Sequence, residues 1–125
     1  MAKEKQKKIF IIDDEEEICA MLENFFEEKN LKVVTFPDGV SALKYIKEKA
    51  IPDLVIIDLL LPKEHGIDVM HKINNQYILP VIIISGIYHK DEIIQSMAND
   101  NVRGFFEKPL DLNRLWRKVE NILHG

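Results

Sequence analysis

The stretch Val55-Ile56-Ile57-Asp58 joins a continuous apolar run to a single carboxylate at its end. Phe10-Ile11-Ile12 is followed in the same way by the acid pair Asp13-Asp14. Val81-Ile82-Ile83-Ile84 is followed by the hydroxyl of Ser85. Continuous apolar runs of this length, separated by helix-length segments, are typical of parallel strands buried on both faces. Because open parallel sheets bind ligands beyond the carboxyl ends of their strands, we expect these polar groups to meet.

Strand and helix patterns alternate along the whole chain. Further strand patterns cover Leu31 to Phe36 and Val102 to Phe106, and the second leads within two residues to Lys108. Apolar residues at spacings of three and four predict helices, centred on Ile18 to Phe26, Ala42 to Ile46, Val69 to Ile73, Asp91 to Asn99 and Leu112 to Leu123. Five strands and five helices in strict alternation predict an α/β fold, with a doubly wound parallel sheet and helices on both faces.

Size and composition favour a single soluble domain spanning residues 1–125. A chain of 125 residues can bury roughly two-thirds of its unfolded surface in one core. The net charge of −4 argues against nucleic acid as a direct partner. No apolar stretch approaches the roughly 20 residues that span a bilayer, and the lysine-rich start lacks a signal peptide's apolar region. With one cysteine and no membrane segment, we expect a cytoplasmic protein.

The acids at the strand ends predict a cation site. At about 5 Å and an effective dielectric near 20, two ionised carboxylates repel by roughly 3 kcal/mol. Asp13, Asp14 and Asp58 can therefore lie together only with a proton or cation between them. Oxygen ligands select hard ions, which favours Mg²⁺, with Mn²⁺ able to substitute.

The same cluster predicts phosphate chemistry. A carboxylate can act as a nucleophile and carry an acyl phosphate, and Asp58 is the candidate because it is a lone acid at the centre of the sheet. Lys108 would supply a compact positive charge to phosphoryl oxygens, and Ser85 one hydrogen bond. Simpler interpretations stay open. Asp13-Asp14 could be no more than a helix cap, and Asp58 could be a strand-end acid whose carboxylate accepts hydrogen bonds from backbone amides. Glu15 to Glu17 are assigned to solvent at the first turn of a helix.

Taken together in this order, the motifs resemble the receiver domain of two-component response regulators. They are the pair Asp13-Asp14, the segment Asp58-Leu59-Leu60-Leu61-Pro62 with Gly66, Ser85 followed by Gly86, and Lys108-Pro109. The resemblance covers nearly the whole chain, from about Lys7 to Leu123. It implies the flavodoxin-like strand order 2-1-3-4-5.

The resemblance also implies roles for single residues. Asp58 would accept phosphate from the phosphohistidine of a sensor histidine kinase or a histidine phosphotransfer protein. Asp14, Asp58 and the backbone carbonyl of Leu60 would hold Mg²⁺, and Asp13 would act mostly through a water. The Lys108-Pro109 bond would be cis.

A change of surface would follow phosphorylation in such a domain. Ser85 and Lys108 would move toward the phosphoryl group, and Phe105 would turn inward as the switch aromatic. The altered surface would comprise the helix at Asp91 to Asn99, the fifth strand and the helix at Leu112 to Leu123. The family often has Thr and Tyr where Ser85 and Phe105 stand. Leu60 and Ile87, which occupy positions that tune dephosphorylation, are apolar here, which predicts a long-lived phosphoryl group.

Two other classes of function compete with a phosphorylation switch. An aspartyl-phosphate hydrolase would need a second acid two residues after its nucleophile, where this chain has Leu60, so we expect a signalling phosphoacceptor rather than an enzyme. A receiver-like interaction module working without phosphorylation stays open. Also open are the downstream partner, a missing output domain, and whether the protein is a monomer or a phosphorylation-promoted dimer.

Overall fold

A computed structural model describes residues 6–86, 91, 95 and 101–125, and these form a five-stranded parallel sheet. The spatial order is β2-β1-β3-β4-β5, which confirms the predicted flavodoxin-like order. The strands are β1 (Lys8–Ile12), β2 (Lys32–Phe36), β3 (Leu54–Asp58), β4 (Val81–Ser85) and β5 (Val102–Glu107). The helices are α1 (Glu16–Glu28), α2 (Gly39–Glu48), α3 (Gly66–Gln76) and α5 (Leu112–His124).

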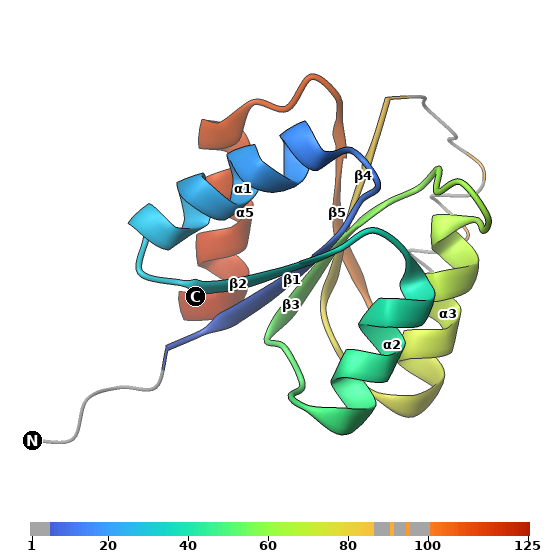
Figure 1. The fold of residues 1–125 in the computed structure, drawn as a ribbon. Coiled ribbons are helices and arrows are strands. Elements are labelled where there is room, and N and C mark those ends of the chain that lie inside the picture. Colours follow the sequence, from blue (N-terminus) through green and yellow to red (C-terminus); the bar gives the residue numbers. More distant parts are fainter. Residues whose placement is uncertain (1–5, 87–90, 92–94, 96–100) are drawn as a thin grey trace, which may run out of the picture.

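Both faces of the sheet are covered, as the continuous apolar strands predict. Helices α1 and α5 lie on one face, and α2 and α3 on the other (Figure 1). Alternate residues of one strand enter opposite cores: Ile56 of β3 packs with the α1 and α5 side, and Ile57 with the α2 and α3 side. Every residue of β3 and β4 is buried. Because successive side chains of a strand point to opposite faces of the sheet, one apolar strand contributes side chains to both cores.

The strand register brings the predicted site residues to one edge. Asp58 lies opposite Ile84, one residue before Ser85, and Ser85 lies opposite Glu107, one residue before Lys108. Sheet-like hydrogen bonds extend beyond the strands: the Asp13 amide donates to Phe36 at 3.0 Å, and the Lys108 amide to Ser85 at 2.8 Å. The site residues are thus held by the sheet rather than by free loops.

Asp38 and Asp111 are the N-cap residues of helices α2 and α5, and both side chains accept hydrogen bonds from first-turn amides. Asp38 Oδ1 accepts from the Ser41 amide at 2.8 Å, and Asp111 Oδ1 from the amides of Asn113 and Arg114. Glu15 occupies the same N-cap position before α1, but its side chain makes no cap hydrogen bond. Its carboxylate instead accepts a hydrogen bond from Lys108 Nζ.

The helix count and some boundaries differ from the prediction. The described residues contain four helices rather than five, and the predicted helix at Asp91 to Asn99 falls mostly outside them. The strand predicted over Val55 to Asp58 begins one residue earlier, at Leu54, and α3 extends beyond its predicted apolar core in both directions. Apolar patterns mark buried centres well, whereas ends depend on local hydrogen bonds.

The described helices are short. The longest, α1 and α5, have 13 residues each. Within residues 6–86, 91, 95 and 101–125, no helix has the length and apolar character needed to cross a membrane. Their buried residues form one stripe that packs on the sheet, such as Leu115 and Val119 in α5.

Candidate functional site

Three carboxylates meet where β1 and β3 end. One oxygen each of Asp13, Asp14 and Asp58 lies within 4.8 Å of the others. Asp13 and Asp58 are buried, with 1% and 4% of their surface exposed, whereas Asp14 is exposed. Two buried acids beside a solvent-facing one form a concentrated negative site with access from outside.

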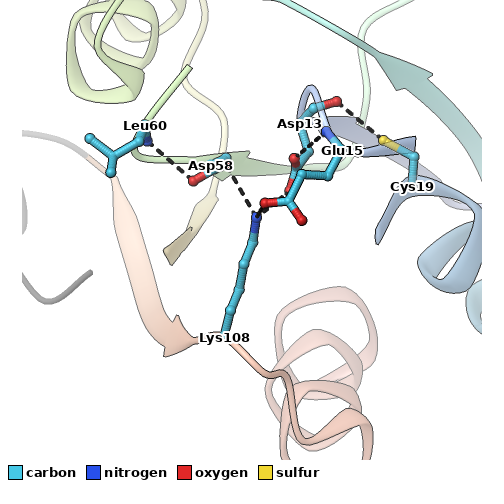
Figure 2. A network of polar contacts seen from close by, with 6 residues as sticks. All are labelled: Asp13, Glu15, Cys19, Asp58, Leu60 and Lys108. Carbon is cyan, nitrogen blue, oxygen red and sulfur yellow. Dashed lines mark hydrogen bonds and ion pairs between the residues drawn. The ribbon is translucent and has the colours of Figure 1, made fainter. Parts of the chain in front are cut away.

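The loop after β3 holds Asp58 in place. Asp58 Oδ1 accepts a hydrogen bond from the Leu60 amide at 3.1 Å. The loop closes on itself, because the Gly66 amide donates to the Leu59 carbonyl at 2.7 Å and Leu60 bridges to His65. The second carboxylate oxygen of Asp58, Oδ2, accepts a hydrogen bond from Lys108, which is the dashed line between these two residues in Figure 2.

Lys108 reaches into the cluster from the end of β5 (Figure 2). Its Nζ donates to Asp58 Oδ2 at 3.2 Å and to Glu15 Oε1 at 3.0 Å. Asp13 Oδ2 lies at ion-pair distance, 3.0 Å from the same nitrogen. A single ammonium group therefore faces three carboxylates, and 11% of the lysine side chain is exposed.

Asp13 keeps one buried oxygen without a hydrogen bond. Its Oδ1 accepts from the Glu15 amide at 2.8 Å. Its Oδ2 has an ion-pair contact with Lys108 but accepts no hydrogen bond from the part of the chain that the structure describes. Burial raises the pKa of Asp13, and the charge of Asp58 adds to this, against the Glu15 amide and Lys108. A buried carboxylate oxygen that has an ion-pair contact but no hydrogen bond can still bind a metal ion or a water.

The charge of Lys108 is stabilised by the cluster. Burial alone would lower the pKa of its ammonium group. The contacts with Asp13 and Glu15, and the charge of Asp58, outweigh burial and raise the pKa. Lys108 therefore remains a cation at any physiological pH.

The other predicted residues lie on the neighbouring strand ends, in the sheet or in the loop after β3. Ser85 ends β4 and is fully buried. Phe105 is half-buried in β5 and packs against the core under α2 and α3. The Leu60 side chain is 40% exposed beside Asp58. The Lys108-Pro109 bond is cis, as the resemblance implied, and Ile87 lies outside the described residues.

Glu15 is the site residue that the sequence interpretation missed. Its side chain is 55% exposed, in agreement with the assignment to solvent, but its Oε1 also lies 3.0 Å from Lys108 Nζ, a contact that was not predicted. One signal was available in the sequence: Glu is a poor N-cap residue, and here it directly precedes a helix.

The cluster fits a magnesium ion. Its donors are carboxylate oxygens, the ligands that hard divalent cations prefer. Asp13 Oδ2 offers a buried oxygen with no hydrogen bond among the described residues, and Asp14 adds an exposed carboxylate. The residues that would hold Mg²⁺ are therefore Asp13, Asp14 and Asp58.

Comparison with known proteins identifies relatives over nearly the whole chain. The family model described as "Response regulator receiver domain" matches residues 9–120. The alkaline phosphatase synthesis transcriptional regulatory protein PhoP of Bacillus subtilis is 37% identical over 120 residues, covering 94% of this chain and 48% of that protein. The response regulator ArlR of Staphylococcus aureus is 33% identical over 122 residues, covering 93% and 52%. This chain thus spans about half the length of these two relatives.

Solved structures share the fold. A two-component response regulator from Clostridium difficile superposes with a TM-score of 0.86 at 29% identity, covering 94% of this chain and 96% of that one. A signal receiver domain from Pseudomonas fluorescens superposes with a TM-score of 0.88, covering 95% of each chain, but at 22% identity it supports the fold alone.

Proposed function

We propose that this chain, which belongs to the response regulator receiver domain family, accepts a phosphoryl group on Asp58. The general role of the family is a phosphorylation-dependent switch in two-component signalling. The observation that carries the assignment to Asp58 is its position: a buried carboxylate, 3.2 Å from Lys108 and within 4.8 Å of two further acids.

The proposed step is transfer from a phosphohistidine on a kinase or phosphotransfer protein. A carboxylate oxygen of Asp58 forms a bond to phosphorus while the phosphorus–nitrogen bond breaks, and the imidazole leaves with the electron pair. The Leu60 amide orients the carboxylate through Oδ1. Lys108 supplies positive charge to the phosphoryl oxygens as negative charge accumulates there.

Magnesium is the proposed cofactor, with Mn²⁺ as a substitute. Asp13, Asp14 and Asp58 supply carboxylate oxygens for it, and the Leu60 carbonyl is the proposed additional ligand. When bound, the ion neutralises charge between the acids and the incoming phosphoryl group. The Glu15 amide donates a hydrogen bond to Asp13 Oδ1, and this bond fixes the direction of the other oxygen, Oδ2.

The proposed response begins at two neighbouring strand ends. Ser85 and Lys108 are joined by the backbone hydrogen bond of 2.8 Å, so a shift of one toward the phosphoryl group is transmitted to the other. Phe105 lies three residues before Lys108 on β5 and is the proposed switch aromatic. The altered surface would include β5, α5 and the segment Asp91 to Asn99. Of these three, only the segment Asp91 to Asn99 lies mostly outside the described residues.

The proposed partners follow from this role. A sensor histidine kinase or histidine phosphotransfer protein would donate phosphate, and a downstream protein or an output domain would read the changed surface. We propose that the domain transmits a signal and does not turn over a substrate. We also propose that it acts in the cytoplasm and has no direct contact with nucleic acid or membrane. For the oligomeric state we propose two alternatives: the domain stays a monomer, or phosphorylation promotes formation of a dimer.

The test is intact-mass measurement after incubation with acetyl phosphate, with and without Mg²⁺. We expect one magnesium-dependent phosphoryl adduct on the wild type and none on Asp58→Asn. Asp68→Asn is the matched control, because Asp68 is an exposed acid in the first turn of α3, and it should gain the adduct normally.

The opposite result would identify the competing function. If neither acetyl phosphate nor phosphoramidate forms an adduct, the chain is an interaction module that works without phosphorylation, and Asp58 is a structural acid. Steady turnover of an ordinary phosphomonoester would instead indicate a hydrolase.

A further inference from the structure

Glu15 stands where a helix cap is expected but does not cap. The N-cap position favours Ser, Thr, Asp or Asn, whose short side chains reach the free amides of the first turn. The Glu15 side chain makes no such bond. Instead its carboxylate accepts a hydrogen bond from Lys108 Nζ at 3.0 Å, across 93 residues of sequence.

This contact uses part of the limited capacity of Lys108. An ammonium group has three donors, and here three carboxylates surround it, those of Asp13, Glu15 and Asp58. Its two hydrogen bonds go to Glu15 and Asp58. Because the third carboxylate, that of Asp13, also lies at ion-pair distance, a phosphoryl group arriving on Asp58 competes with three existing partners for this ammonium group.

Exposure indicates which partner is released. The Glu15 side chain is 55% exposed, whereas those of Asp13 and Asp58 are 0% and 6% exposed. A carboxylate that returns to water loses little, but a buried one left unpaired is costly. Glu15 is therefore the partner that Lys108 exchanges most easily.

We infer that Glu15 is a positioning residue that competes with the incoming phosphoryl group for Lys108 Nζ, and so slows phosphorylation of Asp58. This inference rests on the proposed function of Asp58 as phosphoacceptor. Glu15 acts through Lys108 and does not itself touch the reacting atoms. It sets the rate at which the site responds to a phosphate donor.

Three variants separate the contact from the charge. Glu15→Gln keeps the length of the side chain and removes its charge. Glu15→Asp keeps the charge but is shorter and prefers to bond the free amides of α1, which withdraws it from Lys108. Glu17→Gln removes an equivalent exposed charge two residues away in the first turn of the same helix.

The measurement is the rate of adduct formation with acetyl phosphate at saturating Mg²⁺, by intact mass, with thermal unfolding of each variant alongside. We expect both Glu15 variants to react roughly two- to fivefold faster than the wild type, the factor that corresponds to an exposed ion pair. Glu17→Gln should react at the wild-type rate. Glu15→Asp should also unfold at a higher temperature, so its faster reaction cannot come from a loosened fold.

A double-mutant cycle tests whether Lys108 transmits the effect. In a Lys108→Met background, where the reaction is slower overall, Glu15→Gln should change the rate by less than about 1.5-fold, because the interaction is already lost. An unchanged two- to fivefold increase in this background would contradict the inference. So would any pattern in which the two Glu15 variants do not both exceed Glu17→Gln.

Failure of this inference differs from failure of the proposed function. If the wild type forms no adduct, Asp58 is not a phosphoacceptor and the proposed function itself is wrong. If the wild type reacts but Glu15→Gln, Glu15→Asp and Glu17→Gln all react at one rate, the proposed function stands and the role of Glu15 is refuted.

Discussion

Gly66 packs so closely on the backbone of Asp58 that a Cβ at position 66 would overlap the Asp58 carbonyl oxygen. The same Cβ would lie 2.8 Å from the Leu59 Cα. The start of α3 is therefore pressed against the end of β3, and this contact closes the loop that orients the carboxylate of Asp58.

Gly66→Ala should therefore damage both stability and the site. The obstacles are backbone atoms, which cannot rotate away as a side chain can, so we expect a loss of about 3 kcal/mol in the free energy of unfolding. Urea unfolding measures this. Gly86→Ala is the control, since nothing lies within 4 Å of its added Cβ, and equal losses in both variants would contradict the packing argument.

Lys108→Met should strengthen magnesium binding while weakening phosphorylation. The ammonium group lies 3.0 Å from Asp13 and 3.2 Å from Asp58, so it repels a cation bound to the same carboxylates. We expect the magnesium affinity to rise on the order of tenfold, seen as a larger increase of the unfolding temperature on adding Mg²⁺. The exposed Lys44→Met is the control and should respond as the wild type does.

Asp38→Ala should destabilise the domain at neutral pH but not in acid. Hydrogen bonds from the Ser41 hydroxyl and amide lower the pKa of Asp38. A lowered native pKa stabilises the fold above the ordinary Asp pKa, and this contribution is lost as the pH falls through the native value. We expect a cost of about 1 kcal/mol at pH 7, vanishing toward pH 2, measured by urea unfolding.

Glu48→Gln provides the comparison for Asp38. Glu48 is exposed at the last turn of the same helix, so its substitution should change stability by less than about 0.5 kcal/mol at either pH. A cost of Asp38→Ala that stays constant between pH 7 and pH 2 would show that the ionised cap is not its source.

Cys19 should react slowly with thiol reagents in the folded protein. Burial raises the pKa of its thiol to about 11, and the nearby charge of Asp13 adds to the rise. Since the thiolate is the nucleophile, alkylation by iodoacetamide at pH 8 should be roughly a hundredfold slower than for an ordinary cysteine. The same protein in urea is the control, and equal rates there and in buffer would refute the prediction.

Leu60→Gln should shorten the life of the phosphoryl group. The Leu60 side chain is 40% exposed beside Asp58 and cannot orient an attacking water, whereas an amide can. We expect the wild-type adduct to persist for longer than minutes at neutral pH, and the variant to lose it severalfold faster, followed by intact mass after removal of the donor. Val40→Gln, a similar change at another exposed apolar residue, should leave the lifetime unaltered.

The elements that could be predicted from the sequence are those with a strong local pattern. Runs such as Val55 to Ile57 are apolar at every position, and only a strand covered on both faces buries all of them. The cluster of Asp13, Asp14 and Asp58 was predicted for the same reason, since parallel strands end at one edge. The ends of elements were less well predicted, because they depend on single hydrogen bonds such as that between Gly66 and Leu59.

By itself, the sequence determined the sheet, its two buried faces and the edge where the polar groups meet, because these depend on periodicity and strand direction. The tertiary structure alone decided which groups touch. The Glu15 and Lys108 side chains are 93 residues apart in sequence, and their contact depends on the reach of two long side chains across the sheet edge. The overlap that excludes a Cβ at Gly66 likewise depends on the packing of α3 against β3, which no local pattern encodes.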